Sequence, residues 1–245
     1  MKRITELEIA KMIDHSLLHP TMTDEILRRE CEVAKKYNVA SVCIKPYAVK
    51  MAADLLKDTG VLVGTVIGFP HGSNTTAVKV FETKEAVKEG AAEIDMVVNI
   101  GKVLSEDWDY VADEISAIHQ VCKDNNAALK VIFENDFLDD DKFKIKLCEI
   151  CSDQGVDFVK TSTGYGFTKQ PDGSYNYKGA TDHDLRLMRK HSAQNVEVKA
   201  AGGVRTLEDT LKVRDLGVTR IGATATEAII LKLREEQPGK SPEGY

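Results

Sequence analysis

The segment EIDMVVN, residues 93–99, is followed by a helix-length stretch at 107–125 and then by LKVIFE, residues 129–134. The two short runs are mostly apolar and lack the alternation of a strand with one exposed face. We therefore expect strands that are buried on both faces of a parallel sheet. The stretch between them carries apolar residues at helical spacing, so the segment predicts a strand–helix–strand unit of an α/β fold.

The same unit recurs along the whole chain of 245 residues. Eight short apolar runs alternate with amphipathic helices, at residues 12–15, 41–45, 62–67, 93–99, 129–134, 157–161, 196–200 and 219–222. Eight units without an internal linker predict one α/β domain, a single (β/α)8 TIM barrel. A doubly wound open sheet is the alternative, but it normally has a glycine-rich turn after its first strand, and residues 14–20 (DHSLLHP) contain no glycine.

Two segments depart from this regularity. Residues 165–178 (YGFTKQPDGSYNYK) form a long polar insertion after the sixth strand, on the face where TIM barrels carry their active sites. This insertion is expected to be a lid, a subunit contact or an inert surface loop. Residues 1–234 are expected to form the barrel domain, and residues 235–245, rich in Gly and Pro, a flexible C-terminal tail.

The composition argues against several classes of protein. Lys and Arg number 33 against 39 Asp and Glu, and the formal net charge of −6 argues against a nucleic-acid-binding protein. No apolar run approaches the roughly 18 residues of a membrane-spanning helix, and charged residues interrupt the N-terminal segment. Neither a membrane nor a secreted protein is expected, and the expected compartment is the cytoplasm.

The five cysteines are an odd number in a long chain, which argues against a disulfide framework. Cys148 and Cys151 form a C-x-x-C pair within an amphipathic helical pattern, where small buried residues are the ordinary interpretation. A zinc site needs a second Cys or His pair at ligand spacing, which we do not find in the sequence. No metal site is therefore expected.

Four charged residues stand in or directly after the apolar runs: Asp14, Asp95, Lys160 and Lys199. At the C-terminal ends of barrel strands they would share one mouth. Burial and a second nearby ammonium both lower the pKa of a lysine, and a neutral lysine attacks carbonyl carbon to form a Schiff base. A partly desolvated Asp95 suits proton transfer in such a reaction. An ion-paired structural residue is the alternative interpretation for each of the four.

Small residues follow three neighbouring strands: Thr163 and Gly164, Gly202 and Gly203, and Gly222 and Thr224. All six are expected to bind substrate, because glycine lets backbone N–H groups approach an anion. The loops after strands seven and eight are the usual phosphate site of TIM barrels. Tight turns without a ligand are the alternative. Together with the two lysines, these residues indicate a phosphorylated carbonyl substrate.

Four motifs resemble the deoxyribose-phosphate aldolase family: FVKTSTG at 158–164, VKAAGGVRT at 198–206, EIDMV at 93–97 and IDHS at 13–16. The resemblance extends over nearly the whole chain. It implies a class I aldolase, a lyase of deoxyribonucleotide catabolism on a TIM barrel. Such an enzyme reversibly cleaves 2-deoxy-D-ribose 5-phosphate to D-glyceraldehyde 3-phosphate and acetaldehyde through a lysine Schiff base. The resemblance implies no metal or other cofactor, and it points to a homodimer.

The resemblance also implies roles for individual residues. By motif match, Lys160 is the Schiff-base lysine, Lys199 is the lysine that perturbs it, and Asp95 is the acid and base of proton transfer. Asp14 and Cys43 match polar positions near the site, and the turns at 202–203 and 222–224 match the phosphate cradle. Some family members end in a mobile tyrosine implicated in proton transfer, and this chain ends in Tyr245.

Three departures from the family pattern leave the substrate range open. They are the insertion at 165–178, the sequence Glu134-Asn135-Asp136 where small or uncharged residues are expected after the glutamate, and Thr224 where a serine is common. Two alternative functions follow. One is another lysine-imine aldolase or transaldolase acting on a different phosphosugar, and the other is a barrel that binds a sugar phosphate without turnover.

Overall fold

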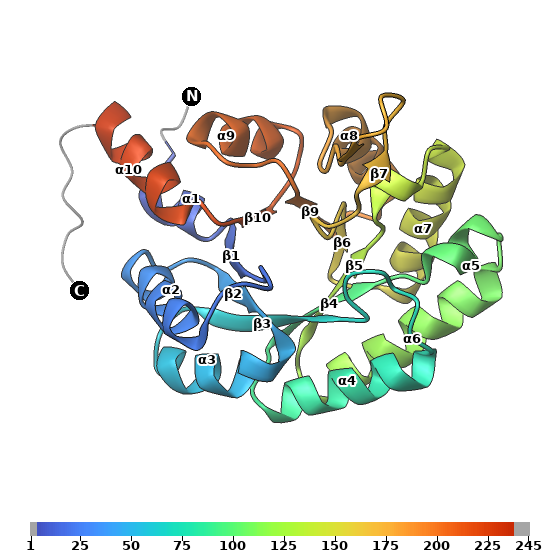
Figure 1. Cartoon of the computed structure of the whole chain (residues 1–245), viewed down its shortest axis with the longest axis horizontal. Helices are drawn as coiled ribbons and strands as arrows, with labels where there is room; N and C mark the ends of the chain where they lie inside the picture. The colour runs from blue at the N-terminus through green and yellow to red at the C-terminus, as the bar shows by residue number, and fades with distance from the viewer. Residues whose placement is uncertain (1–3, 238–245) are drawn as a thin grey trace.

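Eight parallel strands close into a barrel in the computed structural model, which describes residues 4–237 (Figure 1). Neighbouring strands follow the order β1-β10-β9-β6-β5-β4-β3-β2 around the barrel. Their bounds are β1 Ile13–Leu17, β2 Ser41–Ile44, β3 Leu62–Ile67, β4 Glu93–Val97, β5 Ala128–Ile132, β6 Phe158–Lys160, β9 Glu197–Ala201 and β10 Arg220–Ala223. Each overlaps one of the eight sequence-predicted strands, and the TIM barrel is confirmed.

Helices surround the barrel on its outside (Figure 1). The α-helices are α1 Glu6–Ala10, α2 Asp24–Lys36, α3 Val49–Leu56, α4 Thr76–Lys88, α5 Ile100–Leu104, α6 Trp108–Asp124, α7 Asp141–Gln154, α8 Asp182–His191, α9 Leu207–Asp215 and α10 Thr226–Glu236, with short 3-10 helices at Pro46–Ala48 and Asn135–Phe137. The helical pattern at 107–125 is α6, where the Asp107 side chain accepts the N–H of Tyr110 and caps the first turn. α7 is followed by its C-cap Gly155, whose φ of 64° is the left-handed conformation that favours glycine.

Side chains alternate between two environments along the barrel strands, because successive residues of a strand point to opposite faces. On β4, Ile94 and Met96 belong to the apolar core, which includes buried residues of the surrounding helices. Glu93 and Asp95 alternate with them and are buried with ionic partners from other strands. The inside of the barrel therefore holds charges, while its outer surface is apolar.

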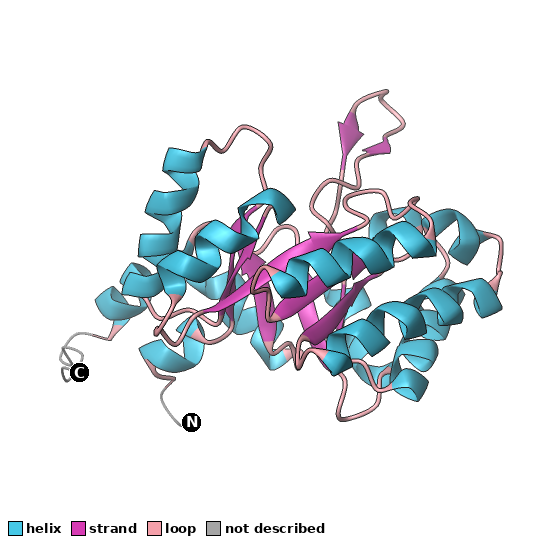
Figure 2. Cartoon of the chain, turned by 90° about the horizontal axis from the view of Figure 1, so that it is seen from below, coloured by secondary structure: helices cyan, strands magenta, loops and turns pink. Residues whose placement is uncertain are grey.

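The insertion at 165–178 contains a small antiparallel hairpin, β7 Thr168–Lys169 paired with β8 Tyr175–Asn176. Figure 2 shows this hairpin standing away from the barrel and its helices. The sequence predicts an insertion at this place but not its two strands. We call residues 165–178 the hairpin segment.

The C-terminal helix α10 ends at Glu236, two residues inside the segment expected to be a tail. Residues 238–245 of that segment, with Tyr245, lie outside the described residues. Cys148 and Cys151 are buried free thiols on α7, so the C-x-x-C pair packs as the helical pattern indicates. Within residues 4–237, no helix combines the length and the apolar character needed to cross a bilayer.

Candidate active site

Asp95 lies at the centre of a group of buried charges inside the barrel. Its Oδ2 atom accepts hydrogen bonds from Lys160 Nζ and Lys199 Nζ, each at 2.7 Å. Its Oδ1 atom accepts one from Lys130 Nζ at 2.9 Å. Lys160 and Lys199 are direct partners in the register of β6 and β9. The prediction that neighbouring strands bring the two amines together is therefore confirmed.

Three more residues extend this group. Lys199 Nζ lies 2.5 Å from Asp14 Oδ2, and Lys130 Nζ lies 2.6 Å from Glu93 Oε2. Arg220 Nη1 donates to Asp14 Oδ1 at 2.5 Å and to Glu93 Oε1 at 3.0 Å. We call the seven side chains the charged cluster: Asp14, Glu93, Asp95, Lys130, Lys160, Lys199 and Arg220.

The balance of charge in this cluster favours a neutral Lys160. Four basic and three acidic side chains are present, so the net charge is +1 with every group ionised and zero when one amine loses its proton. An uncompensated charge in a protein interior is costly. Within residues 4–237, Lys160 pairs with one carboxylate, whereas Lys199 pairs with two. Lys160 is thus the amine that loses its proton most readily.

The two neighbouring lysines have opposite pKa shifts. Burial lowers the pKa of Lys160, and the ammonium of Lys199 adds to this effect while Asp95 opposes it only in part. Burial acts on Lys199 in the same direction, but Asp14 and Asp95 outweigh it and raise the pKa of Lys199. Lys199 is therefore a persistent cation beside an amine that is readily deprotonated.

Asp95 and Asp14 are held in their ionised form. Burial alone would raise the pKa of Asp95, but Lys130, Lys160 and Lys199 outweigh it and bring that pKa well below the ordinary carboxyl range. Burial of Asp14 is likewise outweighed by Lys199 and Lys130, so the pKa of Asp14 is also lowered. Both carboxylates accordingly carry a negative charge at neutral pH.

Cys43 contacts the cluster from β2. Its Sγ lies 4.0 Å from Asp95 Oδ2. Burial raises the pKa of the Cys43 thiol to about 11, and the negative charge of Asp95 acts in the same direction. Because the reactive form of cysteine is the thiolate, Cys43 forms part of the wall of the site at pH 7 and does not act as a nucleophile.

A cavity of about 530 Å³ adjoins the charged cluster, and this volume suits a small-molecule ligand. Ten of the residues expected from the sequence line it: Asp14, Cys43, Lys160, Thr163, Gly164, Lys199, Gly202, Gly203, Gly222 and Thr224. Asp95 contacts this cavity through its hydrogen bonds to Lys160 and Lys199. The structure thus brings together every sequence-predicted site residue except Tyr245, which lies outside the described residues.

The glycine-rich turns form the end of the cavity that suits an anion. Gly202 and Gly203 have φ of 84° and 95°, a conformation that other residues rarely adopt. The 222–224 turn leads into α10, whose N-cap residue Ala225 makes no side-chain hydrogen bond to the first helical turn. The neighbouring helix α9 is capped by its own Thr206 and Asp209, which form a capping box. An anion is therefore better accommodated at the start of α10, where unpaired N–H groups are typical.

Sequence reasoning missed three members of the charged cluster: Glu93, Lys130 and Arg220. A signal was present, because Glu93 and Lys130 belong to the apolar strands β4 and β5 in the same way as Lys160 belongs to β6. Lys130 is in register with Phe158, two residues before Lys160. It therefore lies deeper in the barrel than the strand ends, where the active-site residues of a TIM barrel are expected.

One group of side chains outside this cavity has the composition of a metal site. The ligand atoms of Asp141, His183 and Asp184 lie within 4.8 Å of one another. Lys144 Nζ, however, pairs with Asp141 at 2.9 Å and with Asp184 at 2.7 Å. An ammonium is already bound between the two carboxylates, so this group acts as an ion-pair network between α7 and α8.

The sequence profile of the DeoC/LacD family aldolases matches residues 8–226. The chain belongs to this aldolase family. A deoxyribose-phosphate aldolase from Rhodopirellula baltica is 50% identical to it over 229 residues, which are 94% of this chain and 90% of that protein. One from Caldanaerobacter subterraneus is 47% identical over 234 residues, which are 95% of this chain and 96% of that protein. This DeoC/LacD family member is thus an aldolase, which is a lyase.

Solved structures of aldolases share its fold. The tetrameric deoxyribose phosphate aldolase from Aeropyrum pernix has a TM-score of 0.83 at 28% identity, with 96% of this chain and 94% of that chain covered. An aldolase named QR15 has a TM-score of 0.84 at 33% identity, with 95% of this chain and 99% of that chain covered. The family resemblance expected from the four sequence motifs is confirmed.

Proposed function

We propose that the chain reversibly cleaves 2-deoxy-D-ribose 5-phosphate to D-glyceraldehyde 3-phosphate and acetaldehyde through a Schiff base on Lys160. The single observation that carries this proposal is the pair of buried amines on one carboxylate oxygen, Lys160 and Lys199 on Asp95 Oδ2. This arrangement supports an uncharged Lys160 at the wall of a cavity. The curated relatives with the same name support the choice of substrate.

The first half of the reaction forms the imine. The neutral amine of Lys160 attacks the C1 aldehyde of the open-chain sugar and gives a carbinolamine, which loses water to become a protonated imine. Asp95 Oδ2 lies within hydrogen-bond distance of both lysine amines. It therefore links the Lys160 nitrogen to the ammonium of Lys199 while protons are transferred in this step.

The second half breaks the carbon–carbon bond. The C3 hydroxyl loses its proton to a base, a role we propose for Asp95, and the electron pair of the C2–C3 bond moves into the protonated imine. C3 leaves as the aldehyde of glyceraldehyde 3-phosphate, and an enamine remains on Lys160. Protonation at C2 and addition of the water released earlier free acetaldehyde and regenerate the amine. No step of this sequence needs a metal or another cofactor.

The rest of the cavity holds the far end of the substrate. We propose that the phosphate binds between the turn of Gly202 and Gly203 and the 222–224 turn, at the start of α10. Backbone N–H groups and the helix dipole favour an anion there. Thr163 and Gly164 line the same cavity. Asp14 and Cys43 contribute to the wall beside the amine.

Reductive trapping tests the proposal. Borohydride converts the imine to a stable secondary amine, so incubation with 2-deoxyribose 5-phosphate should leave a covalent adduct on the peptide that carries Lys160. The Lys160→Leu variant is the control and should give no adduct. An adduct on Lys199 alone, or the absence of any adduct, would reject the assignment of roles. Binding of the sugar phosphate without adduct or acetaldehyde release would favour a non-catalytic barrel.

We also propose that the protein is a homodimer in the cytoplasm. Free, buried cysteines, as all five are here, suit a reducing compartment. The tetrameric relative from Aeropyrum pernix supports self-association in this family. Val78 and Phe81 on α4 are exposed apolar side chains that suit a contact between copies. Light scattering tests the dimer, and a monomer mass would refute it.

A further inference from the structure

Two departures from the family sequence pattern meet in the structure. The first is Glu134-Asn135-Asp136, and the second is the hairpin segment, residues 165–178. Asp136 Oδ1 accepts the N–H of Lys178 at 2.5 Å, and its Oδ2 accepts the N–H of Gly179 at 3.0 Å. The turn after β5 thus holds the C-terminal end of the hairpin segment through a carboxylate.

The same turn also holds the N-terminal end of the hairpin segment. The buried carboxylate of Glu134 accepts the N–H of Thr163 at 3.2 Å and also bonds the Thr163 hydroxyl. Thr163 Oγ1 in turn accepts the N–H of Tyr165 at 2.9 Å. Two carboxylates from one turn therefore fix both ends of an insertion whose middle projects from the barrel (Figure 2).

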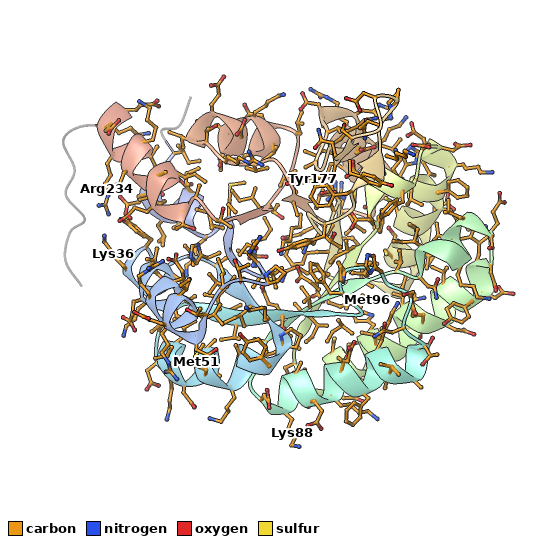
Figure 3. The ribbon with its side chains drawn as sticks, in the orientation of Figure 1. Lys36, Met51, Lys88, Met96, Tyr177 and Arg234 are labelled. Carbon is orange, nitrogen blue, oxygen red and sulfur yellow. The ribbon has the colours of Figure 1, made fainter. Side chains whose placement is uncertain are left out.

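The C-terminal end of the hairpin segment, which Asp136 holds, lies directly against the turn of Gly202 and Gly203 at the end of the cavity that suits an anion. Ala180 N donates to Gly202 O at 3.0 Å, and a Cβ added to Gly179 would lie 2.5 Å from that oxygen. The ring of Tyr177 approaches within 3.2 Å of the position of a Cβ on Gly202. In Figure 3, Tyr177 lies close to β9, which precedes this turn. The position of the Gly202 turn is thus coupled to Asp136 through three consecutive residues, 178–180.

The aromatic residues of the hairpin segment form part of the wall of the cavity. Tyr165, Phe167 and Tyr177 all line it. Phe167 and Tyr177 pack edge to face with ring centroids 5.2 Å apart, and Tyr165 packs in the same way on Phe69 at 5.5 Å. Such pairs restrict the movement of the rings. Tyr175, which is 64% exposed, belongs to the same hairpin but not to this wall.

We infer that Asp136 and Tyr177 together determine specificity for the phosphate-bearing end of the substrate. This inference rests on the proposed function. Tyr177 closes the cavity against the Gly202 turn and so fixes the distance from the reactive amine to the anion site. Asp136 is a positioning residue that acts through the backbone of Lys178 and Gly179. Both residues therefore affect the binding of a phosphorylated substrate and not imine formation at Lys160.

The test compares two substrates, 2-deoxyribose 5-phosphate and unphosphorylated 2-deoxyribose. Asp136→Asn should raise KM for the phosphorylated sugar about tenfold, the scale of one lost hydrogen bond to a charged group. Tyr177→Ala should raise it by a similar factor, the scale of a lost aromatic contact. For both variants kcat should change less than about twofold, and kcat/KM for deoxyribose should stay the same. The matched controls are Asp139→Asn, an exposed acid three residues further on, and Tyr175→Ala, and neither should change KM.

Two further measurements separate this inference from the proposed function. Reductive trapping with acetaldehyde alone should label Lys160 equally in the parent protein and in both variants, because acetaldehyde carries no phosphate. Calorimetric titration of 2-deoxyribose 5-phosphate into a Lys160→Leu background measures affinity without turnover. There Asp136→Asn and Tyr177→Ala should weaken binding about tenfold. Unchanged affinity in both variants, or equal losses for both sugars, would overturn the inference, while failure to trap Lys160 would overturn the proposed function instead.

Discussion

Replacement of Lys199 by methionine should slow the enzyme by removing the cation beside the reactive amine. Lys160 Nζ and Lys199 Nζ each lie 2.7 Å from Asp95 Oδ2, so the two nitrogens are at most twice that distance, 5.4 Å, apart. At this separation two unit charges repel by about 3 kcal/mol with an effective dielectric constant of about 20. That energy corresponds to about a hundredfold in the protonation equilibrium of Lys160. We expect kcat/KM at pH 7 to fall by up to about that factor.

The assay is the release of acetaldehyde from 2-deoxyribose 5-phosphate as a function of pH. The reactive form of Lys160 is the neutral amine, so the rate rises as pH rises through the pKa of Lys160. Loss of Lys199 raises that pKa, and the rising limb of the profile should move to higher pH, with activity partly recovered under alkaline conditions. Lys84→Met, at an exposed position on α4, is the control. A near-normal rate of the folded Lys199→Met protein at pH 7 would refute the charge argument. So would a pH–rate profile whose rising limb stays at the same pH as in the parent protein.

Three further predictions concern other members of the site. Lys160→Leu should abolish acetaldehyde release and keep the native circular dichroism spectrum, and residual turnover above the uncatalysed rate would contradict its assignment. Lys130→Met should lower the free energy of unfolding, measured in urea, by about 3–5 kcal/mol, because it removes a buried cation from Glu93 and Asp95. A loss below about 1 kcal/mol would show that the charged cluster is stable without the Lys130 ammonium. Cys43, with a pKa raised to about 11, should react with iodoacetamide at pH 8 far more slowly than free cysteine, as followed by mass spectrometry, and rapid labelling would contradict its neutral, buried state.

The fold could be predicted because its signals are local. Each of the eight strands is a short run of mostly buried residues. A helix such as α6 carries both its apolar spacing and its capping residue Asp107 in the sequence. The positions of Lys160 and Lys199 followed from the same argument, since parallel neighbours place their C-terminal ends together. These features depend on residues close in sequence and on the rules of barrel topology.

The remaining part of the site depends on register and on contacts between distant segments. Lys130 and Glu93 lie within mostly apolar strands, and only the folded barrel shows that their side chains belong to the inward face of β4 and β5. Arg220 reaches Asp14 across more than 200 residues of sequence. The hydrogen bonds of Asp136 to Lys178 and Gly179 likewise join two loops far apart in the chain. No pattern within one segment records such pairings.

Nuclear magnetic resonance of lysine labelled with ¹³C at the ε carbon measures whether the surroundings of Lys160 keep its amine uncharged. The Lys160 signal is identified by its absence in Lys160→Leu. We expect the pKa of Lys160 to lie below the ordinary lysine value of about 10.4, and Lys199→Met to move it upward. Titration of Lys160 at the ordinary lysine value in the folded protein would refute a neutral amine.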